Sequence, residues 1–495
     1  MGRTRSYESG LYNQLEKLNA KIDNLINENR NQSLIIYDLK LELEKANKLL
    51  EEKDAKIALL IEENEKLKNK NNKNSSNSSK PSSTNMTTPK TSANQYNGRA
   101  KTNKRVGGQV GHTPHSLTKE KVEELINSGK VEVKEIYHTI KGNSNLKPII
   151  KYRLGMEVKT YVEKHIFMYD KNSKETLPKE FYTDVTYDNG IKAVSIELGV
   201  NNVVSYERMS DFFNIISNDI LNISNGTLVN FLYEFGLKSE ATINNLEDNL
   251  LNGINMFTDE TGSKFNKKNM FVRNYSNKQT VVYKAHKHKG HAPIKDDNIL
   301  TRFTGGIMGD HDTTLYSYGT KNYECNVHLG RYLEELIQNI PDIIWPIKMK
   351  ELIFRMHNTR KIALAYGVNS FSKSKIEEYE KEFDEILDLA KEESKKISSR
   401  YYKGKAKSLY TRLVKYKKNH LYFIEDFSVE FDNNMSEQDL RIFKIKTKVS
   451  GGFRSMKGAD SYVKALSIIK TSKKRKINPF DSIKRIFNNE ILFSN

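Results

Sequence analysis

The sequence has little cysteine and no long apolar run. Cys325 is the only cysteine among 495 residues, which excludes a disulfide framework and any zinc site built from cysteines alone. No apolar run reaches the roughly 18 residues that a transmembrane helix needs, and the first residues lack the apolar stretch of a secretory signal. We therefore expect a soluble, intracellular protein, long enough for about three domains.

Negative charge is also in short supply. The chain carries 81 Lys and Arg against 62 Asp and Glu, a net charge of +19, and its pI is near 9.4. The stretch from Arg441 to Arg485 holds 14 basic residues and two acidic ones. Such a cluster favours a polyanionic partner, with DNA ahead of an anionic membrane surface, although a single lysine can also belong to a solvated surface.

Glycine and proline are absent from residues 11–67, where mostly apolar residues recur at alternating spacings of four and three. This heptad pattern predicts a long helix with a coiled-coil seam. Asn29 and Asn64 fall at a positions of the seam, where paired asparagines fix the register and favour a parallel dimer. Self-association through residues 11–67 is the favoured interpretation, and packing of the helix against its own protein is the alternative.

The region that follows is less regular. Residues 69–97 are rich in Asn, Ser, Thr and Lys and predict a flexible linker. Weak alternation of apolar residues between 132 and 167 predicts short strands. Residues 191–235 predict helices, one of them with Ser224 as its N-cap, and both a helix-turn-helix and ordinary core packing fit this segment.

The second half of the chain mixes strand and helix patterns. The strand patterns include a hairpin, and the helical patterns are strongly charged. We expect strands at 254–258 and 307–308, a hairpin of 270–275 with 280–285, and helices over 329–410 and from 429 to 441.

Three carboxylates stand at the ends of these elements. Asp259 and Asp310 each end an expected strand, and Glu437 lies on an expected helix. Together they can supply oxygen ligands for two magnesium ions, which activate an attacking water or 3′ hydroxyl and steady the leaving oxygen of a phosphodiester. Asp312 is the alternative to Asp310, and Glu260 should point to the side of its strand opposite Asp259.

Two other groups have the spacing of metal ligands. Cys325 and His328 form a CxxH pair, but zinc takes four ligands and no second pair lies nearby in the sequence, so a packed core position is favoured. The segment HKHKGH interleaves three histidines with lysines, which favours a DNA-facing loop over a cation site: His286, His288 and His291. An apolar set predicts the core of a helical segment: Ile343, Ile344, Trp345 and Met349.

Seven short motifs follow the heptad arm in a fixed order. They are NSSKPSS at 77–83, GGQVGH at 107–112, FTDET at 257–261, GDH at 309–311, CNVHLGR at 325–331, FDNNMSE at 431–437 and KVSGGFRS at 448–455. With these motifs, nearly the whole chain resembles the insertion sequence 66 family of DDE transposases.

The resemblance implies a mixed α/β fold with an RNase H-like catalytic core. It implies that Asp259, Asp310 and Glu437 are both catalytic and metal-binding, with Mg²⁺ or Mn²⁺ as cofactor. It also implies DNA contacts from basic residues after the glutamate: Arg441, Lys444, Lys446, Lys448 and Arg454. The basic cluster itself adds further expected DNA contacts: Lys473, Lys474, Arg475 and Lys476. Asn433 and Asn434 either shape the start of the glutamate helix or contact DNA.

The resemblance also suggests how the chain is organised. We expect a coiled-coil arm (1–70), a flexible basic linker (71–106), a DNA-end-binding region (107–250), a first part of the RNase H-like core (251–328), a helical insertion (329–424) and a second core part with a basic tail (425–495). The DNA-end-binding region lacks the cysteines that the family often has there, so no zinc is expected. Ser436 and Gln438 flank the glutamate where the family usually has Ala and Arg.

The implied function is magnesium-dependent cleavage and strand transfer of an insertion sequence. The implied partners are double-stranded DNA of the element ends and target, a second copy of the chain, and accessory proteins of the same element, with no membrane. The implied location is the bacterial cytoplasm, associated with the nucleoid. The alternative function is a non-catalytic DNA-binding scaffold or repressor derived from a transposase.

Overall fold

The computed structural model describes residues 2–74, 77–78, 118–136, 150–154, 156, 158–167, 181, 183–340 and 342–494. The chain divides into two compact units. The first contains Met1–Thr91, Gly330–Arg355 and Glu377–Lys415, and the second contains Ser92–Leu329, Met356–Ile376 and Tyr416–Asn495. The motif GGQVGH and most of the predicted linker lie outside the described residues.

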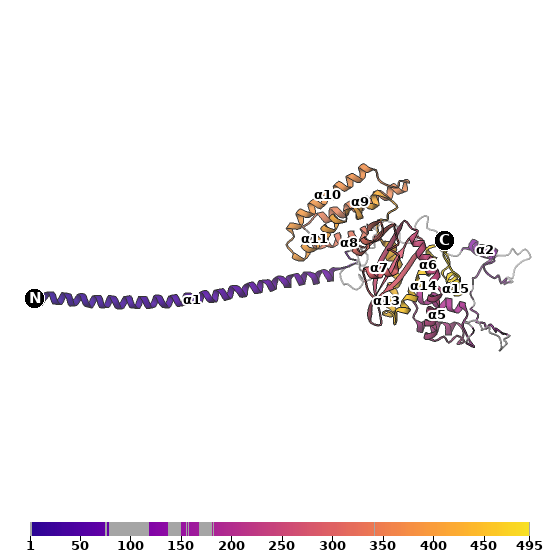
Figure 1. Ribbon diagram of the computed structural model, residues 1–495, viewed down its shortest axis with the longest axis horizontal. Coiled ribbons are helices and arrows are strands. Elements are labelled where there is room, and N and C mark those ends of the chain that lie inside the picture. The colour runs from indigo at the N-terminus through magenta and orange to yellow at the C-terminus, as the bar shows by residue number, and fades with distance from the viewer. Residues whose placement is uncertain are drawn as a thin grey trace, which may run out of the picture. The chain divides into compact units, whose positions relative to one another are not determined.

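The N-terminal segment forms one uninterrupted helix, α1 (Gly2–Asn72), as the heptad pattern predicts (Figure 1). Seam residues Leu15, Leu25, Leu39 and Leu60 are each between 55% and 59% exposed. In the part of the chain that the structure describes, nothing buries the seam between Leu15 and Leu60. Over most of its length the helix therefore carries an apolar stripe that none of the described residues covers.

The first unit also contains charged helices from the middle of the chain. They are the end of α8 (Asn326–Asn339), the first half of α9 (Trp345–Ala365), most of α10 (Lys373–Lys396) and α11 (Arg400–Lys415). Glu393 accepts hydrogen bonds from the backbone N–H groups of Ile344 (2.8 Å) and Trp345 (2.9 Å), which satisfies donors at the start of α9. The helical prediction for 329–410 is confirmed, but Ile344 is 53% exposed and was wrongly assigned to the core. Among the described residues, no helix has the length and apolar character to cross a membrane.

The second unit is built on a five-stranded mixed sheet (Figure 1). Its strands are β1 (Asn255–Phe265), β2 (Lys268–Ser276), β3 (Val281–His286), β4 (Gly306–Gly309) and β5 (Lys321–Glu324), in the order β3-β2-β1-β4-β5. The first three strands are antiparallel, whereas β4 and β5 run parallel to β1. The predicted hairpin is confirmed as β2 and β3.

Strand β1 is longer than its sequence pattern indicates. The prediction of a strand ending at Thr258 is wrong, because the chain continues as far as Phe265 while paired with β2. Pairing with β4 involves only Asn255–Phe257. Asp259 therefore lies inside a strand, but just beyond the part of it that is covered on both edges.

Two C-terminal helices complete the core of this unit. Helices α13 (Asn434–Ser450) and α14 (Met456–Lys474) pack on the antiparallel strands, and α14 also contacts α5 (Asn225–Lys238), α6 (Glu240–Leu251) and α15 (Pro479–Phe487). Many of their apolar residues, among them Leu440, Phe443 and Leu466, are buried in one cluster with the strands, and burying such side chains supplies the main stabilisation. The remaining elements are α2 (Lys119–Asn127), α3 (Asn189–Ile196), the π-helix η3 (Glu197–Asn201), α4 (Tyr206–Ile216), α7 (His291–Asp297), the 3-10 helix η4 (Thr313–Ser317) and α12 (Lys417–Glu425).

The motif KVSGGFRS joins α13 to the sheet. Gly451 ends α13 in the left-handed conformation, with φ of +68°. Gly452 has φ of +129°, and a Cβ there would lie 2.4 Å from the carbonyl oxygen of Lys264, so only glycine fits. The next residue, Phe453, donates its N–H to that same oxygen at 2.8 Å. The two glycines thus let the chain after α13 pair with the end of β1.

The strands predicted between 132 and 167 are absent from the described residues of that range, so the prediction is wrong for them. Their apolar side chains are exposed, as in Ile136 (75%), Val162 (92%) and Ile166 (72%), and a strand is stable only when a neighbour takes its backbone hydrogen bonds. By contrast, the predicted helices of 191–235 are confirmed. Ser224 caps α5 by accepting from the N–H of Thr227.

Candidate active site

Three carboxylates approach one another from three elements of the second unit. Asp259 lies on β1, Asp310 directly follows β4, and Glu437 is in the first turn of α13. Phe257 and Met308 are paired across the parallel strands, so Asp259 and Asp310, each two residues further on, continue that register. Side chains at matched positions of neighbouring strands point to the same side, which brings the two aspartates together.

The electrostatics of Asp259 reflect this convergence. Burial, followed by the nearby charge of Asp310 and more weakly that of Glu437, raises the pKa of Asp259 to about 6. Lys444 opposes the shift from 4.0 Å, and the backbone N–H of Glu260 opposes it through a 2.7 Å hydrogen bond to Oδ1. A dication bound between these carboxylates would relieve the repulsion among their negative charges.

Cys325 and His328 belong to the same group of side chains. His328 Nδ1 lies 3.0 Å from Asp310 Oδ1, 3.6 Å from Glu437 Oε1 and 3.3 Å from Cys325 Sγ. Ligand atoms of the four side chains all lie within 4.8 Å of one another, and this is the single such group among the residues that the structure describes. Cys325 and His328 are 1% and 4% exposed, so the sequence interpretation of a packed core position is confirmed. Their approach to Asp310 and Glu437 is not visible in the local spacing.

The buried side chain of Asn433, just before α13, ties these segments together. Its Nδ2 donates to the carbonyl oxygen of Thr258 at 2.9 Å and to Asp310 Oδ1 at 3.4 Å, and its backbone N–H donates to Cys325 Sγ at 3.3 Å. Asn433 is fully buried, whereas Asn434 is exposed. Of the two interpretations that the sequence left for Asn433, shaping the start of the helix therefore agrees with its position.

A second amide links β1, β2 and α13. Asn274 Oδ1 accepts hydrogen bonds from the backbone N–H of Asp259 (3.0 Å) and from the hydroxyl of Ser436 (2.7 Å). Its Nδ2 donates to the carbonyl oxygen of Ser436 at 3.2 Å. Ser436, a departure from the family pattern, therefore has a specific role here, because its hydroxyl helps to fix the helical turn that carries Glu437.

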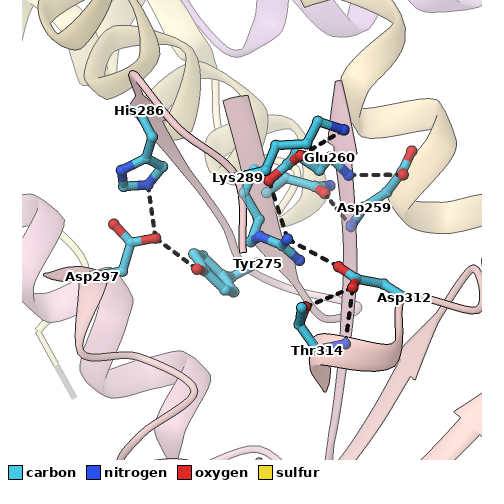
Figure 2. Close-up of polar contacts among 10 residues, drawn as sticks. Asp259, Glu260, Tyr275, His286, Lys289, Asp297, Asp312 and Thr314 are labelled. Atoms are coloured by element: carbon cyan, nitrogen blue, oxygen red, sulfur yellow. Dashed lines mark hydrogen bonds and ion pairs between the residues drawn. The ribbon is translucent and has the colours of Figure 1, made fainter. Parts of the chain in front are cut away.

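A second group of charges is centred on the buried side chain of Arg273, and Figure 2 labels its members Glu260, Lys289 and Asp312. Arg273 is opposite Glu260 across β1 and β2, and its Nη2 lies 3.1 Å from Glu260 Oε2 and 3.1 Å from Asp312 Oδ2. Lys289 approaches the other oxygen of Glu260 at 2.9 Å. As predicted, Glu260 faces partners different from those of Asp259.

The partners of Asp312 show which of the two aspartates, Asp310 or Asp312, lies with Asp259 and Glu437. Asp312 binds Arg273 and also accepts hydrogen bonds from the N–H and hydroxyl of Thr314 at the start of η4 (Figure 2). Burial alone would raise the pKa of Asp312, but the hydrogen bonds of Thr314 and the charge of Arg273 outweigh it and hold the pKa below its ordinary value. Asp310, not Asp312, lies with the other two carboxylates.

Two histidines of the HKHKGH segment have separate partners. His286 Nε2 lies 3.0 Å from Asp297 Oδ2, which also accepts a 2.6 Å hydrogen bond from Tyr275 (Figure 2). His291 lies 3.1 Å from the hydroxyl of Tyr318. In the described part of the chain these histidines do not come together as metal ligands.

The basic residues after the glutamate fall into separate sets. Arg441, Lys444 and Lys448 follow Glu437 at intervals of four, three and four residues, so all four lie on one face of α13. Arg441 and Lys448 are exposed and Lys444 is partly exposed. We refer to Arg441, Lys444 and Lys448 as the basic stripe of α13.

Lys446 lies on the other side of this helix. Its ammonium is 5.8 Å and 5.6 Å from the ring centres of Tyr206 and Tyr462, and burial lowers its pKa. Lys474 forms an internal ion pair with Asp439 at 2.7 Å, so its charge is already neutralised. Of the other predicted DNA contacts, Arg475 packs over a ring, and three are exposed: Arg454, Lys473 and Lys476.

Comparison with known proteins identifies a family. A model of the family described as "Transposase IS66 family" matches residues 185–461, more than half of the chain. The matched region contains the three carboxylates, Cys325, His328 and the basic stripe of α13. No curated protein matches the chain.

Proposed function

The chain belongs to the IS66 family of transposases, and from this premise we propose that it cuts DNA at the ends of an insertion sequence and joins those ends to target DNA. The family assigns the chain to DNA transposition as a class of activity. The proposal adds that the chemistry is of the DDE type, that it depends on Mg²⁺ or Mn²⁺, and that Asp259, Asp310 and Glu437 carry it.

The convergence of these three carboxylates is the observation that supports the proposal most. Carboxylate oxygens are the ligands that Mg²⁺ and Mn²⁺ favour. The pKa of Asp259 is raised by burial and by its two acidic neighbours, which fits a place for added positive charge. In addition, the buried Oδ1 of Asn433, next to Asp310, accepts no hydrogen bond from the described residues. Dications bound here would activate the attacking oxygen and stabilise the leaving oxygen of a phosphodiester.

The arrangement of the sheet supports an RNase H-like core. Three antiparallel strands followed by two parallel ones, in the order β3-β2-β1-β4-β5, place acidic residues on β1 and after β4 at neighbouring positions. Helix α13 then brings the third carboxylate to the same place from a distant part of the chain. The helices between β5 and α13 correspond to the predicted insertion, of which only parts belong to the first compact unit.

The basic stripe of α13 supports the DNA-binding part of the proposal. Because Arg441, Lys444 and Lys448 share a helical face with Glu437, a DNA backbone that reaches Glu437 also passes along these cations. Each phosphate that they contact releases counterions and strengthens binding at low salt. Lys444 also lies 4.0 Å from Asp259, so it can hold a phosphate oxygen close to the carboxylates.

The uncovered seam of α1 supports self-association. Two parallel copies would bury the seam leucines of residues 11–67 against each other and pair Asn29 with Asn29 and Asn64 with Asn64. A dimer offers two active sites, one for each end of a mobile element. Accessory proteins of the same element and association with the nucleoid stay predictions from the family.

The proposal is tested with the purified chain, Mg²⁺ and labelled DNA that carries the ends flanking its own gene. We expect the wild type to cut this DNA and Asp259→Asn to bind it without cutting. Asp460→Asn, at a half-exposed acid on α14, serves as the matched control and should cut normally. Cutting by Asp259→Asn at the wild-type rate would refute the assignment.

A further inference from the structure

The four donor atoms around His328 differ in kind from the oxygen ligands that Mg²⁺ prefers. Asp310 and Glu437 offer oxygen, His328 offers nitrogen and Cys325 offers sulfur. His328 and Cys325 are 4% and 1% exposed, whereas the side chains of Asp310 and Glu437 are 22% and 23% exposed. The soft donors thus form the floor of the site, and the carboxylates form the side that solvent reaches.

The distances match those between ligands of one ion. Zinc binds nitrogen and oxygen at about 2.0–2.2 Å and sulfur at about 2.3 Å, so neighbouring ligands in a tetrahedral site lie roughly 3.3–3.7 Å apart. His328 Nδ1 lies 3.0 Å, 3.3 Å and 3.6 Å from the donor atoms of Asp310, Cys325 and Glu437. The donor atoms of the other three side chains lie within 4.8 Å of one another, so shifts of up to roughly 1 Å would bring all four donors onto one ion.

We infer that Asp310, Cys325, His328 and Glu437 form a site for a divalent transition metal that accepts sulfur and nitrogen, such as Zn²⁺ or Co²⁺. This inference rests on the proposed function, since it shares two carboxylates with that site, and Asp259 remains for an ion held by oxygen alone. It replaces the expectation of no zinc, which was based on the missing cysteine-rich segment. Soft ligands select such metals over Mg²⁺.

The surroundings of Cys325 suit a metal-bound thiolate. Cys325 is 1% exposed, and a thiol that coordinates a dication loses its proton outright, so it would bind the ion as a thiolate. The backbone N–H of Asn433 already donates to Sγ at 3.3 Å and would stabilise a thiolate there. Since Asn433 also binds Thr258 and Asp310, the sulfur and the carboxylate are held by one residue.

The test is a Co²⁺ titration of the full chain after treatment with a chelator. Cobalt bound to a thiolate gives a charge-transfer absorption band, and Cys325 is the only cysteine, so any such band reports on this site alone. We expect the band to saturate at one equivalent of Co²⁺ and to persist in excess Mg²⁺. Cys325→Ser should lose the band, and His328→Ala should bind Co²⁺ at least about tenfold more weakly. His286→Gln, whose histidine pairs with Asp297, is the control and should bind like the wild type.

Two results would overturn the inference. The first is Co²⁺ binding by the wild-type chain with no thiolate band, a result that needs no variant and is independent of how variants fold. The second is equal Co²⁺ affinity in the wild type and in folded His328→Ala. Cleavage assays separate this inference from the proposed function. A cobalt–thiolate band without DNA cleavage would support the metal site and reject the transposase chemistry. DNA cleavage with Mg²⁺ alone and no cobalt–thiolate band would support the transposase chemistry and reject the metal site.

Discussion

Replacing Arg273 should loosen the strands that carry the carboxylates. Its side chain is 3% exposed and binds Glu260, which is 9% exposed, and Asp312, which is 35% exposed. Removing one member of a buried ion pair costs about 3–5 kcal/mol, because the remaining charge stays buried without its partner. Lys289 still reaches Glu260, and Asp312 is open to water, so we expect about 2–4 kcal/mol for Arg273→Met.

The loss of stability in Arg273→Met should be confined to the strands near Arg273, so the assay must measure stability region by region. Hydrogen exchange followed by mass spectrometry gives opening free energies for separate peptides. Peptides from β1 and β2 should exchange faster in Arg273→Met by an amount that corresponds to this free energy. Peptides around Trp345, in the other compact unit, should exchange as in the wild type and serve as the internal reference.

Lys289→Met is the matched comparison. Lys289 binds the same carboxylate, but its side chain is 58% exposed, and exposed pairs contribute only about 0–1 kcal/mol. Equal effects of the two substitutions, or a loss below about 1 kcal/mol for Arg273→Met, would refute the conclusion that Arg273 holds β1 and the segment after β4 together.

Three further predictions concern charge, DNA and assembly. Without added metal, the raised pKa of Asp259 stabilises the folded chain most below pH 4. This stabilisation is lost as the pH rises through about 6, because Asp259 then becomes a charged carboxylate in a buried, acidic environment. Denaturant unfolding should therefore find Asp259→Asn more stable than the wild type by about 2–3 kcal/mol at pH 8 and similar at pH 4, and a difference independent of pH would contradict this. The double variant Arg441→Gln/Lys448→Gln should reduce the steepness of log DNA affinity against log salt concentration by about 2, whereas Lys446→Gln should leave it unchanged. Equal slopes for the double variant and for Lys446→Gln would exclude the basic stripe of α13 from the DNA interface. Deleting residues 2–60, which spares the contacts of Glu65 with Ser399 and of Asn69 with Lys405, should convert a dimer into a monomer in light scattering. An unchanged molar mass would exclude the coil as the dimer interface.

Local sequence patterns predicted which helices and strands form better than they predicted where these elements begin and end. The strand before Asp310 is only four residues long and is followed by a polar residue, so its end is visible in the sequence. Strand β1 is different, because its pairing with β4 ends at Phe257. The residues beyond pair with β2 and, at Phe265, with Phe453, and most of their side chains are partly exposed. A half-exposed polar strand has no apolar run to mark it, and its pairing depends on a hairpin partner.

The composition of the site was harder to predict than its carboxylates. Cys325 and His328 were correctly seen as a pair, but the donors that complete the group come from Asp310 and from Glu437, more than a hundred residues further on. Spacing rules detect ligands that share one local element, and they cannot detect ligands that only the sheet brings together. Similarly, nothing in the sequence around Arg273 indicates that it is buried between two acids.

Cleavage by matched variants of α13 tests the central claim most directly. The wild type, Glu437→Gln and Gln438→Ala would each be incubated with Mg²⁺ and labelled DNA that carries the flanking element ends. Glu437 faces the other carboxylates, whereas its neighbour Gln438 is exposed. We predict cleavage by the wild type and by Gln438→Ala, and DNA binding without cleavage by Glu437→Gln. Cleavage by Glu437→Gln at the wild-type rate would contradict the claim that these three carboxylates form the catalytic centre.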